Sequence, residues 1–334
     1  MKLPTAASLK KVSPQNLARL GADHLAEILV EVAETRPELK RRLRMELAAE
    51  QGADHLTLEL DKRLASLETS RSKVSWRKRP SFVADLDGLR ALIAERLSVL
   101  DPTAALTRLF VFMDAARRLG GRVRDKDGSL AAVFDRAAAD IGRLLGARED
   151  LRALDGLVEA IGRNPAAWAN WLPAALADTS PSLRGALLAR LRARDETGPA
   201  WSSILRVSAD AAGDVDAFLS TLTAHAARTP SVAAEAARRL LGAGRVAEAG
   251  RLLEGARQAG EPDFDWETAV IDYLEAAGQS EAAQAARWTS FERTLSVARA
   301  RDHVRRLTGF DDVEAESRAL HHAASFPDAG RALA

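Results

Sequence analysis

Apolar residues recur at spacings of three and four along almost the whole chain of 334 residues. Stripes of this kind occupy residues 85–100, 129–145 and 151–161. Such a period is typical of an amphipathic α-helix with one buried face. No segment shows the alternation that is typical of a β-strand. The pattern therefore predicts an all-α protein.

Five dipeptides mark where helices are expected to begin, because each has a residue that can cap a helix followed by proline. They are Ser13-Pro14, Asp101-Pro102, Asn164-Pro165, Ser180-Pro181 and Thr229-Pro230. The stretch LTRLFVFMDAA, residues 106–116, is apolar on most faces. Its helix is expected to be central and covered on several sides.

An internal repeat lies near the end of the chain. Residues 240–256, LLGAGRVAEAGRLLEGA, align with residues 274–290, LEAAGQSEAAQAARWTS, at an offset of 34 that places Gly244 over Gly278. This period resembles that of a tetratricopeptide (TPR) helical hairpin. The fold class predicted is an α-solenoid of TPR-like stacked hairpins, with a compact irregular helical fold as the alternative. We assign residues 1–80 to an N-terminal helical segment and 81–334 to a repeat region, either continuous with it or separate.

Five stretches resemble a bacterial family known only as a domain of unknown function. They are ADHLAEILVEVAETRPELKRRLRMELAAE, VSWRKRPSFVADLDGLRALI, RVRDKDGSLAAVFDRAAADIGRLL and, near the C-terminus, ARWTSFERTLS and FDDVEAESRALHHAASFPDAGRAL. Similar helical segments follow zinc-binding SWIM-type modules in other bacterial proteins, but the cysteines of such a module are missing here. The resemblance implies an all-helical, repeat-like architecture. It brings no agreed activity and no catalytic residues.

The composition excludes several kinds of chemistry. The chain has no cysteine, which rules out disulfides and thiolate catalysis. No phosphate-binding loop, nucleophile elbow or H-E-x-x-H motif occurs. In RDKDGS, residues 124–129, a calcium loop that starts at Asp125 would need glutamate where Arg136 stands. We therefore expect a turn closed by Gly128 with Ser129 capping the next helix, no metal, no cofactor and no enzymatic activity.

Two expectations concern location and the end of the chain. No apolar run approaches a membrane span and the first residues lack a signal-peptide core, so we expect a cytoplasmic protein. The chain is expected to be shorter than its relatives, with a short last helix near Pro327. An apolar patch that includes Val313, Leu320 and Phe326 is then expected to be exposed and to cause self-association through the C-terminal end.

Basic residues cluster in two runs, residues 36–44 and 71–79, although the formal net charge is only +1. In the first run we expect Leu39, Leu43 and Leu47 to form a buried stripe. In the second we expect Trp76 to be at least half buried as an anchor, with its basic neighbours exposed. The candidate binding surface comprises Arg41, Arg42, Arg71, Lys73, Arg77, Lys78 and Arg79.

The favoured hypothesis is a non-enzymatic, macromolecule-binding protein, and in particular a protein–protein interaction scaffold that binds through a groove of stacked helices. The alternative is a nucleic-acid-associated helical protein that uses the two basic runs, since phosphate binding by basic side chains with an aromatic ring stacked on a base is physically reasonable. An exposed Trp76 ring beside a basic groove would favour the alternative.

Overall fold

The computed structural model describes residues 11–256, 263–307 and 311–326. Within these ranges it contains helices and turns without a β-strand, which confirms the all-α prediction. No helix in the described part of the chain is long and apolar enough to cross a membrane. The contacts divide the chain into two compact units, unit 1 at Met1–Ala212 and unit 2 at Gly213–Ala334.

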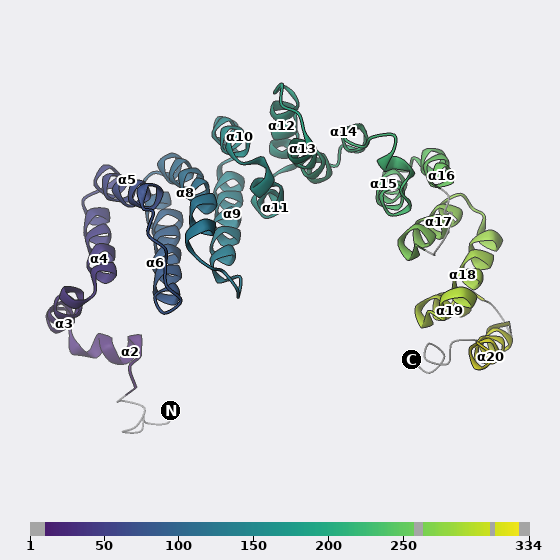
Figure 1. Cartoon of the computed structure of the whole chain (residues 1–334), viewed down its shortest axis with the longest axis horizontal. Helices are drawn as coiled ribbons and strands as arrows, with labels where there is room; N and C mark the ends of the chain where they lie inside the picture. Colours follow the sequence, from purple (N-terminus) through teal and green to yellow (C-terminus); the bar gives the residue numbers. More distant parts are fainter. Residues whose placement is uncertain (1–10, 257–262, 308–310, 327–334) are drawn as a thin grey trace. The chain divides into compact units, whose positions relative to one another are not determined.

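Unit 1 is built from successive helices joined by short turns (Figure 1). A short 3-10 turn at Ala18–Leu20 follows α2, and a π-helical segment at Leu92–Leu97 joins α6 to α7. The helices are α2 (Pro14–Leu17), α3 (Ala22–Thr35), α4 (Pro37–Glu50), α5 (Ala53–Thr69), α6 (Arg79–Ala91), α7 (Ser98–Leu100), α8 (Pro102–Arg122), α9 (Ser129–Arg148), α10 (Ala153–Arg163), α11 (Pro165–Leu176), α12 (Pro181–Arg192) and α13 (Pro199–Ala212).

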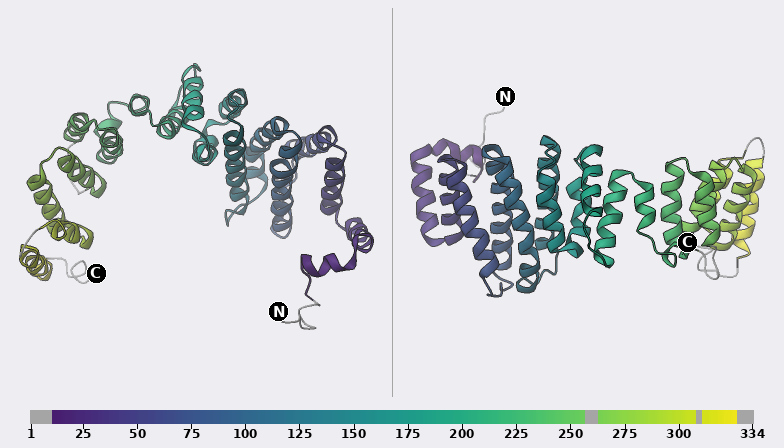
Figure 2. Two further views of the ribbon diagram at one scale, coloured as in Figure 1. Left: turned by 180° about the vertical axis from the view of Figure 1, so that it is seen from behind. Right: turned by 90° about the horizontal axis from the view of Figure 1, so that it is seen from above.

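The helices of unit 1 alternate between two layers. Along one layer α5 packs against α8, α8 against α10, and α10 against α12. Along the other α4 packs against α6, α6 against α9, α9 against α11, and α11 against α13. Within each unit the helices stand side by side (Figure 2). This arrangement is a helical-repeat, solenoid-like fold, as predicted.

The predicted apolar stripes lie between the two layers. All seven stripe residues of α9 are buried, and the stripes of α6 and α10 are buried except at their ends, at Leu100 and Leu151. The helix α8 is covered by α5, α9 and α10, as expected for its apolar sequence. One buried cluster extends from Met45 to Ile204 and includes residues on both sides of position 80. Helices α5 and α6 therefore share one core.

All five predicted helix starts are confirmed, since α2, α8, α11, α12 and α15 each begin at the expected proline. The side chains of Ser13, Asp101 and Ser180 accept hydrogen bonds from backbone N–H groups of the first helical turn. Helices α11 and α15 also begin at the expected proline, although the side chains of Asn164 and Thr229 form no capping hydrogen bond. Proline at the first helical position loses no hydrogen bond, which explains why the signal is reliable.

Unit 2 contains a 3-10 turn at Ala226–Arg228 and a series of helices that continue the hairpin pattern. They are α14 (Val215–Ser220), α15 (Pro230–Gly242), α16 (Val246–Gly255), α17 (Phe264–Ala276), α18 (Ser280–Thr294), α19 (Val297–Val304) and α20 (Asp311–Ala324). Helix α15 packs against α16 and α17, and α17 packs against α18. The predicted last helix near Pro327 lies outside the described residues.

The two turns that the predicted 34-residue repeat aligns have matching backbone geometry. Gly244 and Gly278 end their helices with φ values of 73° and 72°. The N–H groups of the next residues, Arg245 and Gln279, each donate to the carbonyl oxygen of the leucine five residues earlier, Leu240 and Leu274 respectively, at 2.8 Å in both cases. Glycine is favoured here because the left-handed conformation strains other residues.

Two glycines on α9 allow α11 and the turn after it to approach closely. A Cβ atom added at Gly142 would lie 2.8 Å from the carbonyl oxygen of Ala175, and one at Gly146 would collide with the carbonyl oxygen of Asp178. These neighbours are backbone atoms, which cannot rotate away. The contact between α9 and α11 therefore depends on the absence of side chains at these positions.

We predict that Gly142→Ala lowers the free energy of unfolding by about 1–3 kcal/mol, because the added methyl group overpacks this contact. The matched control is Gly185→Ala on α12, where a Cβ atom would meet nothing within 4 Å. Since glycine is a poor helix former, the control is expected to be neutral or to stabilise by up to about 1 kcal/mol. Urea unfolding followed by circular dichroism measures both. Equal effects of the two substitutions would contradict the close contact.

Candidate binding surface

Helix α4 carries the first basic run, but its buried face differs from the predicted one. Leu39 and Leu43 are only half buried and Leu47 is 64% exposed, so the predicted stripe is wrong. The buried residues are instead Met45, Ala48 and Ala49. The same spacing of three and four fits more than one face of this helix, and the small alanines are the residues that allow close packing of neighbouring helices.

Arg41 is held by an ion pair inside unit 1. Its guanidinium lies 3.3 Å from both carboxylate oxygens of Asp85 of α6, and Arg63 of α5 contacts one of these oxygens at 2.5 Å. Burial lowers the pKa of Arg63, Asp85 opposes this shift, and the nearby positive charge of Arg41 adds to it. Arg41 therefore joins α4 to α6, whereas Arg42 is exposed to solvent.

A basic groove of about 320 Å³ runs between α4 and α5. Its cationic lining includes two residues of α5 that the sequence analysis missed; the five cations are Lys40, Arg41, Arg44, Lys62 and Arg63. The one acid that lines it, Glu59, pairs with Lys62 at 2.6 Å. The turn at Gly52 is the sequence feature that could have identified these residues. A hairpin brings together residues that are equally far from its turn, and Arg41 and Arg63 are equally distant from Gly52 along the chain.

The second basic run forms the connector between α5 and α6, residues 70–78, and one arginine of α8 holds it in place. The side chain of Arg122 donates hydrogen bonds to the carbonyl oxygens of Leu67 and Ser72 and to the hydroxyl group of Ser70, at 2.9–3.1 Å. The Val74 N–H donates to the Arg122 carbonyl oxygen at 3.0 Å. The connector is thus fixed on one side and faces solvent on the other.

Trp76 is 76% exposed, so the prediction that it is at least half buried is wrong. Val74 and Phe82 contact the core in its place. The chain turns between them, where the Lys78 N–H donates to the Ser75 carbonyl oxygen at 3.0 Å, and Trp76 lies within this turn. The guanidinium carbon of Arg77 is 5.2 Å from the centroid of the indole ring, a cation–π contact.

The basic residues of the connector differ in their surroundings. Arg77 and Lys78 are exposed, as predicted, and so are Arg71 and Lys73. Arg79 does not follow the prediction, because only 22% of its side chain is exposed. It donates to the Arg124 carbonyl oxygen at 2.9 Å and to Asp127 at 2.8 Å. Arg79 therefore holds the loop before α9 and contributes little to a free surface.

The loop at residues 124–129 is a helix start. Gly128 has φ of 70° and closes the turn, as predicted. The cap, however, is Asp125, whose carboxylate accepts from the N–H groups of Leu130 and Ala131 at 3.1 and 2.9 Å. Ser129 instead donates to Asp127. Among the described residues no group of three metal-ligating side chains occurs.

The two basic runs approach each other without merging. A second groove of about 250 Å³ is lined by Arg36 and Arg42 of the first run and by Ser81, which follows the second run directly. The basic side chains of the connector line neither this groove nor the one between α4 and α5. Unit 1 therefore presents two separate cationic areas, one on α4 and α5 and one on the connector.

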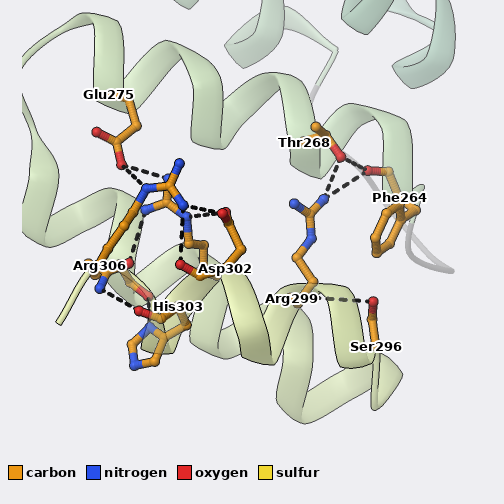
Figure 3. Close-up of polar contacts among 10 residues, drawn as sticks. Phe264, Thr268, Glu275, Ser296, Arg299, Asp302, His303 and Arg306 are labelled. Atoms are coloured by element: carbon orange, nitrogen blue, oxygen red, sulfur yellow. Dashed lines mark hydrogen bonds and ion pairs between the residues drawn. The ribbon is translucent and has the colours of Figure 1, made fainter. Parts of the chain in front are cut away.

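Unit 2 contains a polar cluster around Arg287, which is only 1% exposed. Figure 3 shows three other members of this cluster, Glu275, Asp302 and Arg306. Its guanidinium donates to Glu275 of α17 at 2.6 Å and to Asp302 of α19 at 2.8 Å. Burial alone would raise the pKa of Asp302, but the bonds from Arg287 and Arg306 lower it overall. Because arginines pair with both carboxylates, the cluster joins the three helices α17, α18 and α19.

The two C-terminal stretches that carry the family resemblance lie together in unit 2. The ring centroids of Trp288 and Phe291 on α18 are 5.3 Å apart, and Arg318 of α20 lies over the Trp288 ring at 4.2 Å. The Nε2 atom of His322 is 2.8 Å from the Glu292 carbonyl oxygen. These contacts attach α20 to α18.

An apolar groove of about 460 Å³, here called the α18–α20 groove, lies among α18, α19 and α20. Its apolar lining includes Phe291, Leu295, Val304 and Leu320. Leu320 is 71% and Val313 61% exposed, as predicted for the C-terminal patch, whereas Phe326 is half buried against His322 and was predicted wrongly. This groove was not found from the sequence, because helix periodicity does not define which helices come together.

The fold and these surfaces define a helical-repeat protein with basic and apolar faces. The family model for the family of unknown function DUF6880 matches residues 7–161 and 147–334. The chain therefore belongs to this family, as the resemblance implied. No curated protein and no solved structure matches it.

We predict that Arg287→Ala lowers the free energy of unfolding by about 3–5 kcal/mol, because it leaves two carboxylates without their buried partner. The control is Arg251→Ala on α16 of the same unit, an exposed arginine whose removal is expected to change stability by less than about 0.5 kcal/mol. Thermal and urea unfolding compare the two. A loss of less than about 1 kcal/mol for Arg287→Ala would contradict a joining role of the cluster.

Proposed function

We propose that the protein is a non-enzymatic, macromolecule-binding helical-repeat protein, and that unit 1 binds single-stranded nucleic acid through the connector between α5 and α6. The observation that carries this proposal is the exposed ring of Trp76 beside Arg77 in a segment that contains no acidic residue from Thr69 to Ala84. The following points support it.

An exposed tryptophan on a fixed segment calls for a physical explanation. Burying roughly 200 Å² of aromatic surface would contribute about 5 kcal/mol at 25 cal/mol per Å². Because Trp76 is exposed, the protein lacks most of this hydrophobic stabilisation. Val74, two residues earlier, does contact the core. An aromatic ring held on the surface is a platform on which an unpaired base stacks, a contact that contributes about 1–3 kcal/mol per base.

The charges around the ring suit a phosphate backbone. Arg71, Lys73, Arg77 and Lys78 are exposed, and none of them forms an ion pair with another described residue. Each phosphate that such a side chain neutralises releases condensed counterions, which favours binding at low salt. Arg41 and Arg79 already form ion pairs within unit 1, so their side chains are less available to bind phosphate.

A single strand fits better than a duplex, because the bases of a duplex are already stacked on one another and present only their edges. The bonds from Arg122 hold the connector before any ligand arrives. Less conformational entropy is then lost on binding than with a mobile loop.

We predict that Trp76→Ala weakens binding of a labelled single-stranded oligonucleotide of about 16 nucleotides by roughly 5- to 150-fold, the equivalent of the stacking term. Trp76→Phe, which keeps an aromatic face, should retain most of the affinity. Fluorescence anisotropy at several salt concentrations measures both. Because the ring is exposed, Trp76→Ala should leave the unfolding midpoint nearly unchanged.

The salt dependence supplies the control. The slope of log K against log salt should flatten by about 0.7 for each phosphate contact removed, hence by about 1.4 in the double variant Lys73→Ala/Lys78→Ala. Arg192→Ala, an exposed arginine on α12, should not alter the slope. Absence of binding at low salt, or an affinity that does not change in Trp76→Ala, would refute the proposal.

A protein–protein interaction scaffold is the second candidate function, and one observation in unit 2 favours it. The α18–α20 groove is apolar and bordered by the exposed side chains of Val297 and Leu320. Grooves between helices with exposed apolar walls are the places where amphipathic helices bind. This function is compatible with nucleic-acid binding, because the two surfaces belong to different units.

We expect the protein to retain a protein from nuclease-treated native lysate, and Leu320→Arg to abolish this retention by placing a charge in the groove. The matched control is Leu47→Arg on α4, where the leucine is similarly exposed. Retention that disappears on nuclease treatment would instead assign the interaction to nucleic acid. Retention unaffected by Leu320→Arg would exclude the groove as the binding site.

A further inference from the structure

The α18–α20 groove has charged side chains on both walls that do not pair with each other. Arg301 and Arg305 stand one helical turn apart on α19, and Glu316 stands on the wall formed by α20. All three are exposed, and no ion pair joins Glu316 to either arginine among the described residues. The groove is therefore open between them, and its charges are available to something that enters it.

Helix α20 has the properties of an occupant for such a groove. Val313 and Leu320 lie seven residues apart and thus on one face of the helix, and both are exposed. Glu316 lies between them on that face, and Asp311, Asp312 and Glu314 make the first turn acidic. An apolar stripe with acidic residues along it is complementary to an apolar groove that has Arg301 and Arg305 on its opposite wall.

We propose that the α18–α20 groove takes α20 of a second copy of this chain. Two copies related by a twofold axis would pack their α20 helices against each other, each in the groove of its partner. Leu320 and Val313 of both copies would then be removed from water. Glu316 of each copy would meet Arg301 and Arg305 of the other, with neither of which it forms an ion pair within one copy among the described residues.

The interface would be small, because it consists mainly of one helix from each copy. Interfaces at the low end of the size range are typically transient. Most of the affinity would come from apolar burial of Leu320 and Val313, while the charge pairs would define the relative orientation of the two copies. We therefore expect a dimer that dissociates on dilution.

This inference rests on the proposal that the α18–α20 groove binds protein, and it identifies the partner. The test is sedimentation of the purified full chain over roughly 1–300 μM, where a transient dimer is populated. We expect Leu320→Arg to raise the dimer dissociation constant at least about 30-fold, as for a central interface residue. Leu47→Arg on α4 should leave it unchanged.

A charge exchange provides the second, sharper readout. The variant Arg301→Glu/Arg305→Glu and the variant Glu316→Arg should each be monomeric, because like charges then face each other across the interface. An equimolar mixture of the two should form a heterodimer, because opposite charges face each other at both sets of pairs: one set keeps its native sign and the other is reversed. Loss of an interaction within one chain would not be rescued by mixing.

A monomer at all concentrations, an unchanged dimer in Leu320→Arg, or a mixture that stays monomeric would each overturn the proposal. Failure of the dimer proposal can be told apart from failure of the proposed scaffold function, because retention of a different protein from lysate is measured separately. A groove that retains a lysate protein while the purified chain stays monomeric would keep the scaffold function and refute the second copy as its partner.

Discussion

The packing of each helix against the next helix of its own layer is the contact on which the rest of the protein depends. In unit 1 α9 lies between α6 and α11, while α8 lies between α5 and α10. Each helix thus buries one apolar stripe against neighbours that are close in sequence, as in other repeat proteins. Gly142 and Gly146 show how close this approach is, because α11 and its turn occupy the space of their missing side chains. Helix ends and connectors remain available to bind other molecules.

Arginine side chains link helices and connectors by hydrogen bonds and ion pairs, in addition to the apolar packing. The planar guanidinium group presents several donors at once, which suits it to unsatisfied carbonyl oxygens at helix ends. Arg122 binds three acceptors around the connector, and Arg79 binds the loop before α9. Arg287 has the same role in unit 2, with acceptors on two other helices. The basic residues of this chain therefore divide into those that join helices and those that remain for a partner.

This division could not be read from the basic runs, and the candidate site shows why. Arg77 and Arg79 are neighbours in one run, yet Arg77 is exposed beside Trp76 while Arg79 is held by Asp127. Trp76 was expected to anchor the connector because it lies in the short apolar run VSW, residues 74–76. Val74 does so instead, since its N–H group is already bound to the carbonyl oxygen of Arg122 and brings its side chain to the core.

The helices, their starts at capped prolines and the glycine turns at Gly244 and Gly278 could be predicted from the sequence. These features depend on residues a few positions apart, through helix periodicity and local hydrogen bonds. Three outcomes could not be predicted in this way: Leu47 and Trp76 face solvent, Lys62 and Arg63 line the basic groove, and α18, α19 and α20 form an apolar one. Those outcomes depend on which of several chemically suitable side chains meets a distant partner, and helix periodicity carries no information about such partners.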